Sequence, residues 1–212
     1  MNIREFRPGD TGALYEICLR TVDAGNDGTP LYPAYPELPG HLALGANLAL
    51  EPELAFVLQD EAGSPVGYVV GALDTRAFYK RSEQLWWPPL RERYPDPADV
   101  PPGQYTPEQR LLHAIHQPAL APDAVLDVFP SHLHINLMPP AQGRGYGKLL
   151  LNTLFAALQD AGSTGIFLGV QPGNDRAMGF YHRMGFHKIP NLPPNWSTRL
   201  GKAFSAADAA DA

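Results

Sequence analysis

Three glycines alternate with other residues in the stretch "PPAQGRGYGKLLL", which runs from Pro139 to Leu151. An apolar helix is expected to begin at the last of these glycines, Gly147. Glycines let a ligand approach the backbone closely, and the N–H groups at a helix N-terminus attract anions. We therefore expect the backbone N–H groups from Gly143 to Lys148 to bind a phosphate group.

Three kinds of phosphate ligand compete for this loop. A nucleotide P-loop requires a hydroxyl residue after Gly147 and Lys148 to bind magnesium, but Leu149 follows them. A dinucleotide-binding fingerprint requires the spacing G-x-G-x-x-G and lies near the first strand of its domain. Gly143, Gly145 and Gly147 have a different spacing and lie in the second half of the chain. The remaining interpretation is a site for the pyrophosphate of coenzyme A.

Histidines precede the loop on a predicted strand. His132, His134 and Asn136 alternate with apolar residues, so they share one face of it. A metal site is not expected here, because no third ligand accompanies His132 and His134, nor His113 and His116.

The elements around the loop form a strand–helix–strand unit. Residues 131–139 predict a strand, 147–161 a helix with one buried apolar face, and 165–172 a second strand. This order predicts a right-handed parallel crossover. A short helix over 174–183 and two further strands, "FHKI" and "STRLGKAF", complete the expected sheet.

The first half of the chain predicts a strand over 3–6, a helix capped by Asp10, a helix over 41–50 and a hairpin over 54–74. Residues 75–130 are expected to be an insertion, with a helix that starts at a capping box between Thr106 and Gln109. We therefore expect one α/β (α+β) domain over residues 1–204, followed by a flexible tail over 205–212.

Composition limits the possible partners. The chain is 44% hydrophobic and 18% charged, which is typical of a globular protein. A net charge of -6 argues against nucleic acid and is compatible with a cationic amine. No apolar run is long enough to span a membrane, the start lacks a signal-peptide core, and Cys18 is the single cysteine. We expect a cytoplasmic protein without a membrane partner.

Two motifs carry a resemblance to a known family. "INLMPPAQGRGYGKLLL" resembles the cofactor loop of the GNAT superfamily of acyl-CoA N-acyltransferases, whose pattern Q/R-x-x-G-x-G/A is matched by Gln142, Gly145 and Gly147. After the next strand, "VQPGNDRAMGFYHRMGF" matches the family's N-x-x-A-x-x-F-Y-x-x-x-G-F, with Asn174 and Tyr181 among the matched residues. Because both motifs occur in order across a strand–helix–strand unit, together they are much more specific than either one.

A broader resemblance covers most of residues 4–190. "LYEICLRTVDAGNDGT", "YPELPG" and "FVLQDEAGSPVGYVVGALD" are similar to the acetyltransferase-like region at the C-terminus of animal protein O-GlcNAc hydrolases and to its free-standing bacterial relatives. The inserted "QLWWPPLRERYP" fits this group too. Cofactor competence does not follow from the fold in this group, but the intact glycine loop favours it.

The resemblance implies a GNAT fold. Its mixed central sheet of six or seven strands would be splayed at the cofactor site, with helices on both faces and the insertion before the central motif strand. Acetyl-CoA would be the co-substrate, with its pantetheine arm added to the sheet at the splay and its acetyl carbonyl polarised by the Leu137 or Met138 amide. The implied cofactor-binding residues are Leu137, Met138, Gln142, Gly143, Arg144, Gly145, Tyr146, Gly147, Lys148, Asn174, Arg176 and Tyr181.

The resemblance also implies direct transfer to an amine. Tyr181 would face the thioester sulfur and protonate the departing thiolate, since a phenol can act as a general acid. The general base is left open among His134, Asp127, His132, and Asp23 or Asp27 in the early loop; His134 and Asp127 are the first candidates.

The sequence is compatible with two functions. The first is an acetyl-CoA-dependent N-acetyltransferase acting on a primary amine of a small molecule or a protein lysine, with transfer of a longer acyl group as a minor variant. The second is a catalytically inactive GNAT-fold module that recognises a protein partner. GNAT proteins are often homodimers, but no stretch of the sequence identifies an interface.

Overall fold

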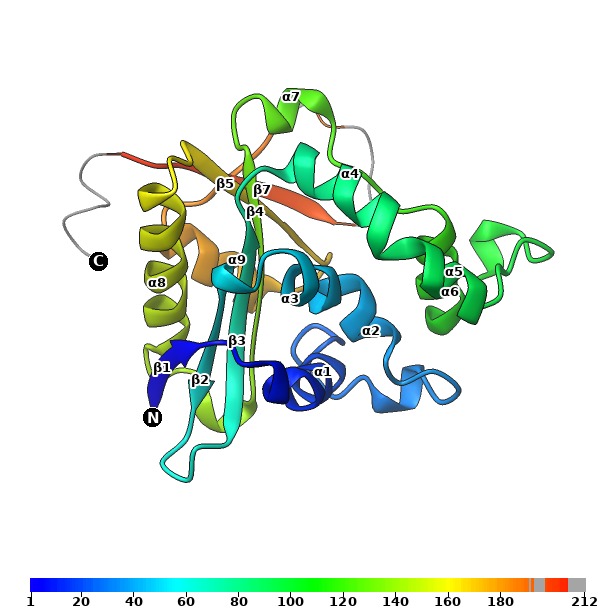
Figure 1. Cartoon of the computed structure of the whole chain (residues 1–212), viewed down its shortest axis with the longest axis horizontal. Coiled ribbons are helices and arrows are strands. Elements are labelled where there is room, and N and C mark those ends of the chain that lie inside the picture. Colours follow the sequence, from blue (N-terminus) through cyan, green and yellow to red (C-terminus); the bar gives the residue numbers. More distant parts are fainter. Residues whose placement is uncertain (191, 193–196, 206–212) are drawn as a thin grey trace.

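The computed structural model describes residues 1–190, 192 and 197–205, and within them the chain forms one seven-stranded sheet (Figure 1). The strand order is β1-β2-β3-β4-β5-β7-β6, and every neighbouring pair is antiparallel except β4 and β5. The strands are β1 (Asn2–Glu5), β2 (Ala55–Gln59), β3 (Pro65–Ala72), β4 (Ser131–Leu137), β5 (Gly165–Val170), β6 (His187–Lys188) and β7 (Thr198–Ala203). The expected α/β fold is confirmed.

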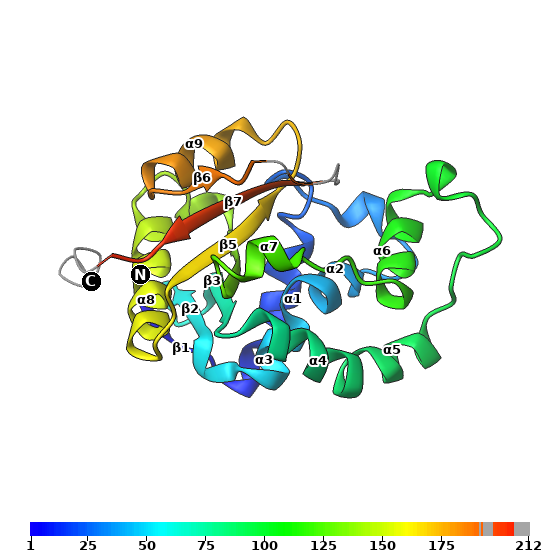
Figure 2. The same cartoon turned by 90° about the horizontal axis from the view of Figure 1, so that it is seen from above.

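Helices cover both faces of this sheet, as Figures 1 and 2 show. On one face, α8 (Tyr146–Asp160) and α9 (Asp175–Arg183) pack on a core that includes Leu133, Leu154 and Leu168. On the other face, α1 (Thr11–Leu19) and α3 (Ala46–Leu50) pack on Val57 and Val70. The helix expected over 41–50 begins earlier, as α2 (Leu38–Gly40), and contains a π-helical turn at His41–Gly45.

Four helices occupy the stretch expected to be an insertion. They are α4 (Thr75–Leu85), α5 (Trp87–Arg93), α6 (Pro107–His116) and α7 (Asp123–Leu126), and α5 and α6 extend away from the sheet (Figure 2). With α2, helices α5 and α6 form a separate apolar cluster of Leu38, Leu90, Tyr94, Leu112 and Ile115. The capping box at the start of α6 is confirmed, because the Thr106 hydroxyl accepts from the Gln109 N–H at 3.2 Å and the Gln109 side chain accepts from the Thr106 N–H at 3.0 Å.

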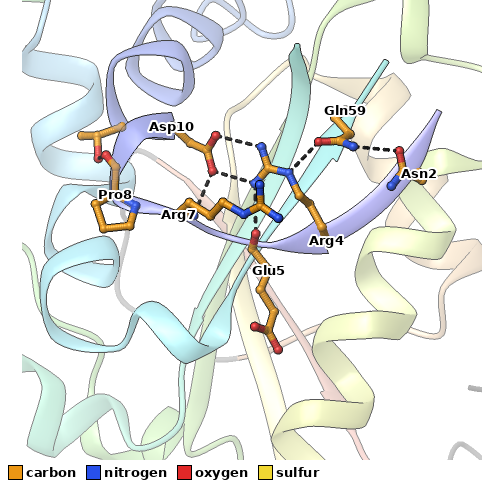
Figure 3. A network of polar contacts seen from close by, with 8 residues as sticks. Asn2, Arg4, Glu5, Arg7, Pro8, Asp10 and Gln59 are labelled. Atoms are coloured by element: carbon orange, nitrogen blue, oxygen red, sulfur yellow. Dashed lines mark hydrogen bonds and ion pairs between the residues drawn. The ribbon is translucent and has the colours of Figure 1, made fainter. Parts of the chain in front are cut away.

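The start of α1 differs from the sequence expectation. Asp10 lies at the N-cap position, but its carboxylate does not bond to the helix. It accepts two bonds from the Arg4 guanidinium, at 2.7 and 2.8 Å, and one from the Arg7 N–H at 2.8 Å (Figure 3). The hydrogen bonds from Arg4 hold the pKa of this carboxyl below its usual value. Charge-assisted bidentate bonds to a neighbouring strand therefore replace the expected helix cap.

The two parallel strands separate soon after they meet. β4 and β5 pair only at Ser131 with Ile166 and at His132 with Phe167. Beyond that point β4 stays paired with β3 as far as Leu137, and β5 stays paired with β7 as far as Val170. The sheet is therefore splayed at the end of β4 that leads into the glycine loop. The flexible tail expected over 205–212 lies, from residue 206 onward, outside the described residues.

Candidate acyl-coenzyme A site

The glycine loop leads into the N-terminus of α8 without a side-chain cap. Gly143 and Gly145 have φ values of +72° and +85°, a region that favours glycine, and a Cβ placed on either would meet no atom within 4 Å. The N–H groups of Tyr146, Gly147 and Lys148 belong to the first turn, where no carbonyl of the helix can accept them. The loop therefore presents open space and unused donors, a combination that fits a pyrophosphate.

Gln142 and Gly147 have structural roles in the loop. The Gln142 side chain donates to the Leu137 carbonyl at 2.7 Å, which fixes the loop against the end of β4. A Cβ on Gly147 would lie 3.2 Å from the Phe180 ring, so the glycine lets α8 and α9 pack closely. Both residues match the motif, but the Gln142 side chain is used to fix the loop and Gly147 allows close helix packing, so an anion would contact the loop backbone.

The register of β4 decides between the two candidate amides. The Met138 N–H donates to the Val66 carbonyl at 2.9 Å, so it is not available to a ligand, and the expectation for this amide is wrong. N–H groups of successive strand residues point to opposite sides, so the Leu137 N–H points toward β5. Because β5 has already separated there, this N–H faces the splay.

Helix α9 brings Asn174 and Tyr181 to the same region. The Asn174 side chain accepts from the Ala177 N–H at 3.0 Å, so it caps the helix. The Tyr181 ring packs against Phe180 and Phe186, with centroid distances of 5.2 and 5.6 Å. Burial raises the pKa of Tyr181 above its ordinary value, so the phenol keeps its proton at neutral pH. Both residues line the cleft that contains the glycine loop.

The opposite face of β4 carries the two histidines. The His134 ring stacks on Tyr68, with centroids 5.9 Å apart, and its Nε2 is buried without a hydrogen-bond partner among the described residues. His132 contacts the Thr75 hydroxyl through Nδ1 at 2.9 Å and packs on Phe78. Burial lowers the pKa of each imidazole to about 4, assisted in His132 by the nearby His134. Both imidazoles are therefore neutral at pH values above about 4.

Tyr68 and Thr21 are partners of this face that sequence reasoning missed. The Tyr68 hydroxyl donates to the Asn136 Oδ1 at 3.4 Å, and the Asn136 amide donates to the Thr21 hydroxyl. These contacts join β3, β4 and the end of α1 beside His134. A period-two pattern placed Tyr68 on a strand, but only the register with β4 sets it against His134.

The acidic base candidates do not reach the cleft. Asp127 follows α7 near the start of β4, is exposed, and forms an ion pair with Arg76 at 2.7 Å. Its expected role as a base is therefore not supported. Asp23 and Asp27 are exposed in the early loop, where Asp27 accepts from the Thr29 N–H at 2.9 Å, and neither lines the cleft. The histidines are the remaining candidates.

The other implied cofactor residues divide into two groups. Lys148 and Arg176 line the cleft. Arg144 is exposed and does not line it, and Tyr146 packs on the core beneath α8. A charge at Arg144 thus stays outside the cleft, while Lys148 and Arg176 lie where an anion would bind.

One continuous cleft of about 2260 Å³ joins the two sides of β4. Its cofactor arm is lined by the glycine loop and α9. Its acceptor arm is lined by α3, α4, α6 and the faces of β4, β5 and β7 that carry His134, Gly169 and Arg199. A pocket for one small ligand spans roughly 300–1,000 Å³, so the cleft has room for more than one such ligand.

Among the described residues, no group of three or more His, Cys, Asp or Glu side chains is arranged to hold a metal. Over the same residues, each helix is too short or too polar to cross a membrane.

Comparison with known proteins agrees with this geometry. The model of the acetyltransferase (GNAT) family matches residues 26–186. Protein O-GlcNAcase of Rattus norvegicus is 28% identical over 191 residues, which cover 90% of this chain and 20% of the relative, and that of Mus musculus matches to the same extent. The chain thus spans about a fifth of the length of these curated relatives.

Solved structures share the fold. The crystal structure of SsHAT is 39% identical, with a TM-score of 0.86, and the match covers 95% of this chain and 97% of SsHAT. A phosphinothricin acetyltransferase (Pat) from Sinorhizobium meliloti, solved in complex with AcCoA, is 15% identical with a TM-score of 0.53, covering 95% of this chain and 87% of that one. At that identity the likeness concerns the fold. The family match, the SsHAT match and the splayed site together show that this chain belongs to the GNAT acetyltransferase family.

Proposed function

We propose that this chain transfers an acetyl group from acetyl-CoA directly to a primary amine. The observation that carries the proposal is the open, uncapped glycine loop beside the splay of β4 and β5. The S. meliloti structure in complex with AcCoA supports the choice of ligand, since it shares this fold. The backbone from Gly143 to Lys148 would hold the pyrophosphate, with Lys148 and Arg176 nearby.

When bound, acetyl-CoA supplies an activated thioester carbonyl. The Leu137 N–H faces the splay and can donate to an oxygen there, which is the arrangement of an oxyanion hole. Because burial raises the pKa of Tyr181, its phenol oxygen keeps its proton at neutral pH. His134 offers a neutral, unpartnered Nε2 on the acceptor side of β4. The proton to be delivered and the site that accepts one thus lie on opposite sides of the splay.

A second candidate, a catalytically inactive binding module, is favoured by one observation. Within the part of the chain that the structure describes, the sole carboxylate lining the cleft is Glu83. An imidazole with a pKa of about 4 is a weak base, so an amine that arrives protonated would depend on water to lose its proton.

Calorimetric titration with acetyl-CoA tests the first proposal. We expect micromolar binding, followed by turnover of at least one member of a panel of amines, and a His134→Gln variant that binds acetyl-CoA normally but turns over more slowly. Binding without turnover of any amine would favour the module. A folded protein that does not bind acetyl-CoA would contradict the enzyme.

A further inference from the structure

Arg199 lies on the acceptor side of the sheet, away from the glycine loop. It pairs with Gly169 across β5 and β7, one residue before the pair of Leu200 and Leu168. The two leucines belong to the core under α8, so Arg199 and Gly169 point to the opposite face. This is also the face of Phe167, which pairs with His132 on β4.

The Arg199 guanidinium has no acidic partner among residues 1–190, 192 and 197–205. Its Nη2 donates to the Leu120 carbonyl at 3.3 Å, and its Nη1 is buried without a hydrogen-bond partner in the described part of the chain. Burial lowers the pKa of Arg199, and the nearby Tyr79 phenol opposes that effect. Tyr79 in turn stacks on His132, with centroids 6.1 Å apart. A guanidinium without a carboxylate partner in the described part of the chain therefore lies on the same wall as the histidines.

Ser197 adds a second polar group to this wall. It lies two residues before Arg199, on the same face, and lines the cleft. A Cβ on Gly169 would lie 2.8 Å from the Ser197 hydroxyl, so the glycine leaves room for that hydroxyl above β5.

The acceptor arm is cationic although the whole chain carries a net charge of -6. Lys80, Arg110 and Arg199 line it, and none of them has a carboxylate within ion-pair distance among the described residues. Glu83 is the carboxylate of the arm, and it is paired with Arg91 at 3.0 Å. A diamine or another polycation would meet like charges here, whereas an anionic group would find unpaired donors.

We propose that the acceptor is a primary amine that also carries a carboxylate, with the carboxylate bound by Arg199 and Ser197 and the amine directed toward His134. This inference rests on the proposed function, because it names the substrate class of the same site. The net charge of -6 is compatible with a purely cationic amine, but the acceptor arm carries the opposite charge and therefore favours an amine that also has an anionic group.

Three amines of matched length test the proposal: ω-aminopentanoate, pentylamine and diaminopentane. Each is titrated into the protein by calorimetry, with and without coenzyme A, and each is offered as a substrate with acetyl-CoA. We expect ω-aminopentanoate to bind roughly tenfold tighter than the other two, since a charge-assisted bond to a half-buried guanidinium contributes about that much. Its KM should be correspondingly lower, with kcat similar for all amines that react.

Variants locate the effect. Arg199→Gln should bring the three affinities within about twofold of each other, Arg199→Lys should keep part of the preference, and Ser197→Ala should reduce it less than Arg199→Gln. Arg20→Gln is the matched control, because Arg20 is exposed and paired with Glu16 outside the cleft. This variant should keep the full preference for ω-aminopentanoate. Circular dichroism and acetyl-CoA affinity check that each variant is folded.

Equal affinity of the wild type for the three amines, tighter binding of diaminopentane, or an unchanged preference in Arg199→Gln would overturn the proposal. A lysine peptide with acidic neighbours, titrated alongside, distinguishes a carboxylate on a peptide from one on a small molecule. If acetyl-CoA does not bind, the proposed function fails, but the titrations without coenzyme A still decide whether the carboxylate is recognised.

Discussion

The two arms of the cleft are built in different ways. The cofactor arm consists mainly of backbone N–H groups, that of Leu137 at the end of β4 and those of Gly143 to Lys148 where the loop enters α8. The acceptor arm consists of side chains from several strands and helices, including His134 on β4, Phe78 on α4 and Arg199 on β7. A site made of backbone is specified by local conformation, whereas a site made of side chains depends on which distant elements meet.

The two arms also differ in electrostatics. The cofactor arm offers unused donors at a helix N-terminus, with Lys148 and Arg176 at its edge. The acceptor arm holds two neutral imidazoles and the guanidinium of Arg199, whose Nη1 has no hydrogen-bond partner among the described residues. The first arrangement suits a strongly charged phosphate, and the second suits an acceptor that carries an anionic group, as proposed above.

The largest effect is expected at Gly145. Gly145→Val places a branched side chain in the open space where we propose that the pyrophosphate binds, and the positive φ of this position disfavours any side chain. Acetyl-CoA binding should therefore be lost. Gly63→Val is the matched control, because Gly63 has the same φ of +85° and equally open surroundings in the turn between β2 and β3. Calorimetry measures both. Similar affinities in the two variants would contradict a backbone-built phosphate site.

Tyr181→Phe separates chemistry from binding. Removing the phenol oxygen should reduce kcat by about 10²–10⁴-fold, the usual contribution of a general acid, while the ring still packs on Phe180 and Phe186. Acetyl-CoA affinity should change little. If kcat is unaffected, Tyr181 has only a packing role.

The buried histidines of the acceptor arm make stability depend on pH. His132 and His134 have folded pKa values of about 4, below the ordinary value of 6.5, so the unfolded chain binds more protons between these values. Their contribution is fully present above about pH 6.5 and is lost as the pH falls toward 4. From about pH 7 to about pH 5, each should cost about 2 kcal/mol of unfolding free energy.

Urea unfolding at the two pH values measures this loss. His132→Phe should reduce the pH dependence, because a phenylalanine does not titrate, and it should do so even if the variant is less stable at both pH values. His187→Gln changes an exposed histidine on β6 and serves as the control. If the unfolding free energy of His132→Phe depends on pH as strongly as that of the wild type, His132 is solvated in the folded protein.

The smallest effect is expected for Asp127→Asn. Asp127 is exposed and paired with Arg76 outside the cleft, so kcat should stay within about twofold of the wild type. Steady-state kinetics with the preferred amine provides the measurement. A large loss of kcat would return this carboxylate to the list of candidate bases and weaken the assignment of His134.

Sequence patterns predicted the elements well where the signals are local. The capping box at Thr106, the helix ends at Gly162 and Gly185, and the helix after Asn174 are all present. The prediction at Asp10 was wrong in detail, because Arg4 lies on the neighbouring strand and binds the carboxylate more strongly than a helix N–H does. A helix-cap pattern contains no information about that strand.

The candidate site was also predicted where its signals are local and missed where they depend on distant residues. Glycine spacing predicted an open loop at a helix N-terminus, which the structure contains, but it could not choose between the Leu137 and Met138 amides, since the choice depends on the register of β4 with β3. Proximity in sequence to the central strand suggested Asp127, yet α7 lies at the opposite end of β4. Arg199 carried no motif, and only the fold shows that its Nη1 is buried without a hydrogen-bond partner among the described residues.

The sequence by itself determined the strand–loop–helix unit, its glycine conformations and the family to which the chain belongs, because these depend on neighbouring residues. The tertiary structure alone decided where the sheet splays, which amide remains free and which charges remain unpaired. These features depend on strand register and on contacts between residues far apart in the chain, so they exist only once β4, β5 and β7 lie side by side.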